Sequence, residues 1–101
     1  MNHFGEKIKE LREQKGLFQK HIASQLDIDT PMLSKIERGE RKAKREQVPI
    51  FAKALTAEKD DLLSLWLADQ VYNVVKDENV ALRAIQVAEE DIKYKSNQEL
   101  K

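Results

Sequence analysis

Six cationic side chains within residues 35–45 give this sequence its strongest chemical signal. They are Lys35, Arg38, Arg41, Lys42, Lys44 and Arg45, set against two carboxylates, Glu37 and Glu40. Guanidinium and ammonium groups bind phosphate oxygens through charge-assisted hydrogen bonds, so a run of this density suits contacts with a phosphate backbone. The same run would also suit a merely solvated surface, and the elements that position it must decide between the two.

Catalytic chemistry has few residues to work with. The sequence has no cysteine and two histidines, His3 and His21, and neither histidine is spaced from carboxylates as a metal site requires. The adjacent carboxylates at 60–61 and at 89–90 have no second acidic cluster to oppose them in general acid and base roles. A glycine-rich phosphate loop is also missing. We therefore expect no enzyme, no metal ion and no cofactor.

Residues 19–41 have the apolar spacing of two short helices joined by a tight turn. Apolar side chains recur at three- and four-residue intervals on one face of each helix, with Ile22, Ala23 and Leu26 on the first and Met32, Leu33 and Ile36 on the second. Ile28 plugs the space between the helices. Asp29 is suited to cap the second helix, and Pro31 falls in its first turn, where the missing N–H costs little. This pattern is typical of a helix-turn-helix, and the basic run follows it directly.

At these residues the chain resembles the phage-repressor and Cro-like helix-turn-helix family of transcriptional regulators, known as the XRE type. The resemblance covers residues 3–67 and rests on Gln19, the Ile22-Ala23 pair, Leu26, Ile28, the Leu33-Ser34 pair and residues 35–39. It implies an all-α fold and double-stranded DNA as the partner, with the second helix of the motif reading the major groove.

The resemblance also implies roles for individual residues. The family's base-reading positions fall on Thr30, Pro31, Met32, Ser34 and Lys35. Gln19 matches a phosphate-binding glutamine at the start of the motif's first helix. Arg12 and Glu37 match positions that form an ion pair between the first helix of the domain and the reading helix. We expect this pair to fix the orientation of the reading helix, as bidentate Arg–carboxylate contacts do.

The basic run lies where it would meet the DNA backbone, directly after the reading helix. We expect phosphate contacts from Arg38, Arg41, Lys42, Lys44 and Arg45, with Lys20 as a further candidate. Among the base-reading positions, Lys35 can donate to guanine O6 and N7, whereas Pro31 offers only apolar contact. Met32 has an alternative role, since it can turn inward and join the core.

Two positions depart from the family pattern. Asp27 occupies the turn position that usually holds glycine and requires a positive φ, and we expect strain of about 1 kcal/mol there and an unchanged fold. Phe18 stands where the family prefers a serine or threonine N-cap. We expect that cap to be missing and the Phe18 ring to pack inward.

The rest of the chain predicts helices throughout, because glycine and proline are confined to ends and turns. The helices are expected over residues 2–15, 19–26, 30–38, 47–55, 59–75 and 78–92. The result is an all-α protein with a five-helix repressor-like DNA-binding domain over residues 1–67. A helical extension follows over residues 68–95, and residues 96–101 form a flexible tail.

Charge and apolar surface differ between the two halves. Residues 1–55 carry 12 Lys/Arg against 8 Asp/Glu, a net charge of +4, whereas residues 56–101 carry 6 against 10, a net charge of −4. The fifth and sixth helices have a wider apolar stripe than one core needs. This favours two contacts together: packing of their hairpin onto the domain, and a homodimer through Trp66, Val71, Val74, Ile85 and Ala88. In the alternative, Trp66 and its neighbours simply close the core of one copy.

The sequence therefore predicts a transcriptional regulator that binds an inverted repeat as a homodimer. Its size and layout are similar to those of the controller proteins of restriction-modification systems, and no small-molecule effector is expected. The alternative is an antitoxin-like interaction protein, whose acidic half binds a partner while the first half regulates its own gene. With no cysteine, no apolar run long enough for a membrane and no signal-peptide pattern, we expect a soluble cytoplasmic protein without membrane contact.

Overall fold

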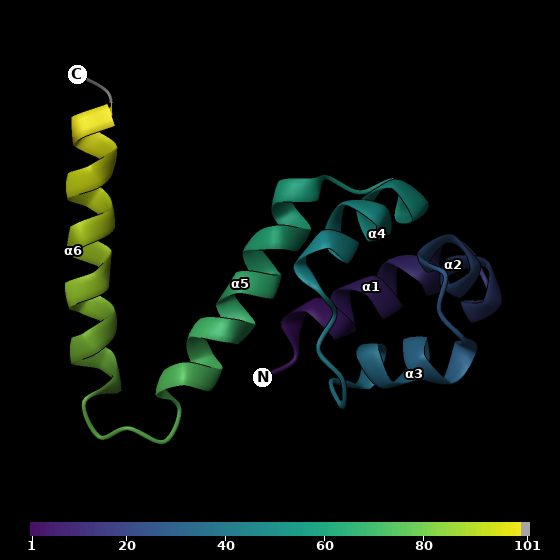
Figure 1. The fold of residues 1–101 in the computed structure, drawn as a ribbon, viewed down its shortest axis with the longest axis horizontal. Helices are drawn as coiled ribbons and strands as arrows, with labels where there is room; N and C mark the ends of the chain where they lie inside the picture. Colours follow the sequence, from purple (N-terminus) through teal and green to yellow (C-terminus); the bar gives the residue numbers. More distant parts are fainter. Residues whose placement is uncertain (100–101) are drawn as a thin grey trace. The chain divides into compact units, whose positions relative to one another are not determined.

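The computed structural model describes residues 1–99, and every regular element within that range is a helix (Figure 1). In order they are α1 (His3–Gln14), α2 (Gln19–Leu26), α3 (Thr30–Arg38), the 3₁₀ turn η1 (Arg45–Gln47), α4 (Val48–Leu55), α5 (Lys59–Val75) and α6 (Ala81–Glu99). The chain divides into an N-terminal unit, Met1–Gln70, and a C-terminal unit that begins at Val71. The predicted all-α class is confirmed.

The helix boundaries agree with the sequence pattern except at α6. Helices α2, α3 and α5 have the predicted bounds, and α1 is one residue shorter at each end. Helix α6 begins three residues later than predicted and continues to Glu99. The residues beyond Ile92 include no glycine or proline, and Lys93 and Lys95 form i,i+4 ion pairs with Glu89 and Glu99. The predicted flexible tail thus starts inside this helix, and its last two residues, 100 and 101, lie outside the described range.

A single apolar core fills the N-terminal unit. Its buried residues come from α1 to α5 and from the loop after α3: Phe4, Ile8, Ile22, Ala23, Leu26, Leu33, Ile36, Ala43, Val48, Phe51, Ala52, Leu55 and Leu62. Phe51 lies at the centre of this core, and its ring meets that of Phe4 edge to face, with centroids 5.5 Å apart. The apolar faces predicted for the two helices of the motif, α2 and α3, are therefore faces that pack into this core.

The turn between α2 and α3 has the local geometry that its residues predict. Asp27 adopts the left-handed conformation with φ 56°, and the N–H of Ile28 returns to the carbonyl of Ala23 at 3.0 Å. Asp29 then caps α3, since its carboxylate accepts from the N–H of Met32 at 2.8 Å. Both aspartates take the roles expected of them, and α3 leaves the turn at a defined angle.

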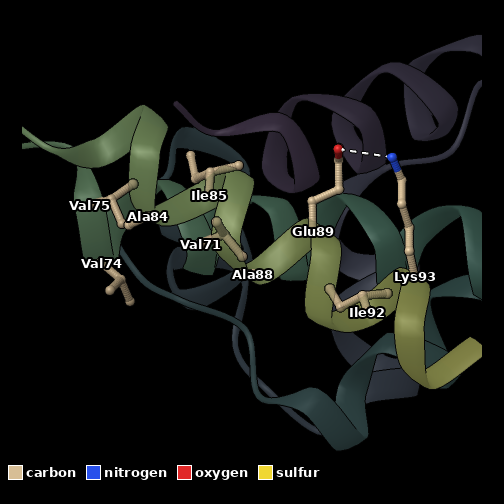
Figure 2. Close-up of a pocket in the computed structure, with 9 residues that line it drawn as sticks. All are labelled: Val71, Val74, Val75, Ala84, Ile85, Ala88, Glu89, Ile92 and Lys93. Atoms are coloured by element: carbon tan, nitrogen blue, oxygen red, sulfur yellow. Dashed lines mark ion pairs between the residues drawn. The ribbon is translucent and has the colours of Figure 1, made fainter.

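The C-terminal unit is a helical hairpin whose described residues include no buried side chain. The last turn of α5 contributes Val71, Val74 and Val75 to one side of a groove of about 550 Å³, and α6 contributes the other side (Figure 2). The residues from α6 are Ala84, Ile85, Ala88, Glu89, Ile92 and Lys93. Among residues 1–99, no helix is both long enough and apolar enough to cross a membrane.

Candidate nucleic-acid interface

Helix α3 presents a short polar face to solvent. Thr30, Pro31 and Lys35 are exposed and Ser34 is half-buried, whereas Leu33 and Ile36 on the opposite face are buried. The exposed face begins at the helix N-terminus, where Pro31 has no N–H and the carboxylate of Asp29 accepts from the N–H of Met32, so the donors of this face are its side chains. A face of this kind can donate hydrogen bonds to base edges or phosphate oxygens.

Met32 does not share that exposed face. Its side chain is partly buried and packs against the core of the N-terminal unit. Of the two roles open to Met32 in the sequence, its environment therefore favours packing. This leaves Thr30, Pro31, Ser34 and Lys35 as the accessible residues of the predicted reading set.

Glu37 is the centre of a polar cluster that holds α3 in place. Its carboxylate is 4% exposed and accepts from Arg12 Nε at 2.8 Å and from Arg12 Nη2 at 3.1 Å, a bidentate ion pair. Gln19 Nε2 donates to the same carboxylate at 3.0 Å, and Arg12 Nη1 donates to the carbonyl of Leu17 at 3.0 Å. Helices α1, α2 and α3 thus meet at one carboxylate.

The electrostatics of this cluster favour the charged guanidinium. The hydrogen bond from Arg12 to Glu37 raises the pKa of Arg12 and outweighs the opposing effect of partial burial. Gln19, predicted to bind phosphate, uses one amide N–H for Glu37, so its second N–H is the group that could face a ligand. The Arg12–Glu37 ion pair was predicted from the sequence, whereas the contact of Gln19 with Glu37 was not.

The basic segment, residues 35–45, places all six of its cations at the surface: Lys35, Arg38, Arg41, Lys42, Lys44 and Arg45. Ala43 in the middle of the segment is buried, so the cations on either side are turned outward. Arg38 is the one of the six that an ion pair engages within residues 1–99, with its Nε 2.6 Å from Glu40 Oε2 and a further contact to Ser34 Oγ. The segment runs from the last turn of α3 to the first residue of η1, which precedes α4 (Figure 1).

Trp66 on α5 contacts the basic segment from within the N-terminal unit. Its indole Nε1 donates to the carbonyl of Ala43 at 2.8 Å, and Lys42 Nζ lies 5.6 Å from the centre of its ring. The five residues predicted to form the dimer interface therefore lie in two places. Trp66 packs against the core of the N-terminal unit, whereas Val71, Val74, Ile85 and Ala88 line the groove of the hairpin. The alternative in which Trp66 closes the core of one copy accounts for its environment.

The expectation that the Phe18 ring packs inward is wrong, since the ring is 65% exposed, whereas the expected absence of a side-chain cap is confirmed. Phe18 is the N-cap residue of α2 with an extended backbone, and it lacks a side-chain oxygen to cap the helix. The ring instead lies beside His21, with centroids 5.8 Å apart, and Lys20 Nζ is 5.9 Å from its centre. Leu17, the residue before it, is the one that packs against the core.

Two residues that position the site, Asp69 and Asn2, were not predicted from the sequence. Asp69 is buried, and its carboxylate oxygens accept from the N–H groups of His3 at 3.0 Å and Phe4 at 2.9 Å. Asn2 accepts from the N–H of Gly5 at 3.1 Å and donates from Nδ2 to the carbonyl of Glu37 at 2.9 Å. Asn2 before a helix is a recognisable N-cap, but no local pattern reveals that Asp69 caps α1 from 66 residues away.

Comparison with known proteins agrees with this architecture. A family model described as a helix-turn-helix domain matches residues 3–66, which includes α1 to α4 and the first part of α5. No curated protein matches the chain. Domains of this family bind DNA, and the matched residues contain the exposed face of α3 and the basic segment. The chain belongs to the helix-turn-helix domain family, a family of XRE-like DNA-binding domains.

Proposed function

We propose that this protein is a sequence-specific regulator of transcription that binds double-stranded DNA. The observation that carries the proposal is the continuity of the exposed face of α3 with the basic segment, in which six cations reach solvent. A reading helix followed at once by phosphate-binding cations supplies both parts of DNA recognition, because base contacts specify the sequence and phosphate contacts fix the register.

In this proposal α3 enters the major groove and reads bases through its first two turns. Lys35 donates to a guanine edge, Thr30 and Ser34 pair with either kind of edge, and Pro31 contacts a thymine methyl group. Each well-formed specific contact discriminates against the wrong base by about 1–3 kcal/mol. Met32 supports the helix from the core side, in keeping with its partial burial.

The phosphate contacts come from the basic segment and from the start of α2. Arg41, Lys42, Lys44 and Arg45 are exposed and outside ion pairs in the described residues, so they can meet phosphates directly. Arg38 would have to exchange Glu40 for a phosphate. Lys20 and the second amide N–H of Gln19 extend this contact to the N-terminus of α2, whose helix dipole also favours an anion.

We further propose that two copies pair through the C-terminal hairpin. Support comes from the groove: Val71, Val74, Ile85 and Ile92 all remain 38% or more exposed, and exposed apolar patches of this kind mark interaction sites. A two-fold dimer would read half-sites about 34 Å apart, which is why we expect an inverted repeat.

Among regulators, a controller protein of a restriction-modification system agrees best with the size and helical layout of the chain, with regulation by protein concentration through dimerisation. An antitoxin-like protein is the second candidate. The observation that favours it is the net charge of −4 over residues 56–101, which together with the open groove would suit a basic partner protein.

Selection of bound duplexes from a random DNA pool tests the proposal. The purified protein is incubated with the pool at about 150 mM salt, at which nonspecific phosphate binding is already weakened. We expect enrichment of an inverted repeat with half-sites one helical turn apart. A folded protein that enriches no sequence would overturn the proposal and favour the partner-binding alternative.

Two variants separate base reading from phosphate binding in the same assay. Lys35→Ala should relax the enriched sequence at one position of each half-site, whereas Lys44→Ala should weaken all sequences alike and lower the salt slope by about one. Lys53→Ala is the matched control, because Lys53 is an exposed lysine of α4, which lies across α1 from α3 (Figure 1). It should leave affinity and salt slope unchanged.

A further inference from the structure

The basic segment has little regular structure of its own between α3 and η1. After Gly39 ends α3, the N–H groups of Glu40 and Arg41 both return to the carbonyl of Lys35, at 2.9 and 3.3 Å. From there to Lys44 the backbone forms neither helix nor strand. Four of the cations offered to DNA are on or next to this stretch, so something outside it must fix its path.

Two residues outside the stretch help to fix it: Gln47 of η1, whose Oε1 accepts from the N–H of Lys44 at 2.8 Å, and Trp66 of α5. The Nε1 of Trp66 donates to the carbonyl of Ala43 at 2.8 Å, at the one position of the stretch whose side chain is buried. Fixing both the methyl group and the carbonyl of Ala43 sets the direction in which its neighbours Lys42 and Lys44 point. The ring also lies 5.6 Å from Lys42 Nζ, which holds that ammonium group close to α5.

Helix α5 is a firm base for this contact. Asp69, three residues after Trp66, is buried and binds the N–H groups of His3 and Phe4 at the start of α1. Helix α1 in turn is bound to α3 through Arg12 and Glu37. The reading helix and the basic segment are therefore fixed to the same frame, α3 through Glu37 and the segment through Trp66.

We propose that Trp66 is a positioning residue for DNA binding, which holds the basic segment in its phosphate-binding conformation before DNA arrives. This inference rests on the proposed function. A loop ordered in advance loses less conformational entropy on binding, so the hydrogen bond to Ala43 increases affinity without touching DNA. When DNA binds, a phosphate draws Lys42 away from the indole ring, while the hydrogen bond to Ala43 remains.

Limited trypsin digestion tests the positioning role without DNA. Trypsin cleaves after lysine and arginine, so the segment itself offers cleavage sites, and Arg83 in the hairpin offers a reference site. Trp66→Phe keeps an aromatic ring but removes the N–H donor, and we expect cleavage in the segment to accelerate several-fold relative to cleavage after Arg83. Leu63→Ala is the control for lost packing on α5, and it should not change this ratio. An unchanged ratio in Trp66→Phe overturns the inference.

The affinity for a duplex is the second readout. Trp66→Phe should bind a duplex of random sequence about 5- to 10-fold more weakly than the wild type with the same salt slope, because the segment makes the same phosphate contacts but must be ordered on binding. Leu63→Ala should keep the affinity. If the wild type binds and Trp66→Phe binds equally well, the inference fails while the proposed function stands. If the wild type binds no duplex, the proposed function fails and the role in DNA binding fails with it, whatever the digestion shows.

The fluorescence of Trp66 follows the movement of Lys42, because the sequence holds one tryptophan. DNA should change the emission of the wild type as the ammonium group leaves the ring. In Lys42→Met that change should be largely lost, whereas the matched variant Lys53→Met should keep it. Equal changes in both variants would contradict the assignment of Lys42 to a phosphate.

Discussion

At the scale of single residues, Glu37 does the most to define the candidate site. Its buried carboxylate joins Arg12 of α1 and Gln19 of α2 to α3. A buried ion pair of this kind contributes more to the geometry than to the net stability, because desolvation offsets much of the attraction. Losing one partner, however, leaves the other charge buried and unpaired.

Glu37→Gln is therefore expected to lower the free energy of unfolding by about 2–3 kcal/mol, measured by urea titration. The guanidinium of Arg12 stays protonated across the neutral range even without Glu37, so a pH change in that range does not relieve the unpaired charge. Glu40→Gln is the control. Glu40 pairs with Arg38 at the surface, and its loss should cost less than about 1 kcal/mol. Equal losses in the two variants would argue against the central role of Glu37.

The two aspartates of the turn make opposite predictions. Asp27 has a left-handed backbone with φ 56°, so Asp27→Gly should raise the free energy of unfolding by roughly 0.5–1 kcal/mol through relief of strain. Asp29 caps α3 from an extended backbone, so Asp29→Ala should lower it by about 1 kcal/mol. Thermal unfolding of both variants under the same conditions checks the signs, and changes of the same sign would contradict this account of the turn.

At the scale of elements, the contact between α1 and α3 sets the position of the reading helix. Gly5 makes this contact possible, because a Cβ at that position would lie 2.4 Å from the carbonyl oxygen of Ile36. The backbone oxygen cannot move away without shifting α3. Two contacts therefore hold α3 against α1: this close approach at Gly5 and the Arg12–Glu37 ion pair.

Gly5→Ala should push the two helices apart and lower the free energy of unfolding by about 1–3 kcal/mol, the usual range for overpacking. It should also weaken DNA binding in proportion to the shift of α3. Gly16→Ala separates steric crowding from backbone strain, because Gly16 has a φ of +66° with no atom within 4 Å of the added Cβ. It should cost about 1–2 kcal/mol and leave the DNA affinity of the folded protein intact. A loss of DNA affinity as large in Gly16→Ala would contradict this reading of the contact.

At the scale of the whole molecule, the two units differ in how they bury apolar side chains. The N-terminal unit has a core of its own, whereas the described residues of the hairpin include none that is buried. Isolated helical hairpins without a core have only marginal stability in water, because tertiary packing supplies most of the stability of a helix. This contrast is the physical reason for proposing that a second copy covers the groove.

Ile92→Lys should convert the dimer that we propose into a monomer, as measured by sedimentation equilibrium, because an ammonium group in the groove would lose its water on pairing. The matched control is Val87→Lys, since Val87 also lies on α6 and is 63% exposed, close to the 65% of Ile92, but does not line this groove. The control should remain a dimer. A wild type that sediments as a monomer at micromolar concentration would refute the pairing.

Much of the N-terminal unit could be predicted from local sequence. The spacing of Ile22, Leu26 and Leu33 indicated both helices of the motif, and Asp27 and Asp29 indicated the turn, because periodicity and capping depend on residues within one or two helical turns. The exposure of the Phe18 ring and the Asp69 cap on α1 were not predicted. They depend on tertiary packing, since Asp69 reaches the start of α1 from a distant segment of the chain.

The sequence by itself determined the all-α class, the bounds of α2, α3 and α5, and a basic segment placed directly after a helix-turn-helix. Tertiary structure alone decided that Trp66 contacts that segment, that Gln19 joins Glu37, and that the hairpin keeps its apolar groove open. The physical reason is range. Helix formation and capping depend on neighbours in the chain, whereas hydrogen bonds between residues such as Ala43 and Trp66 exist only once packing has brought them together.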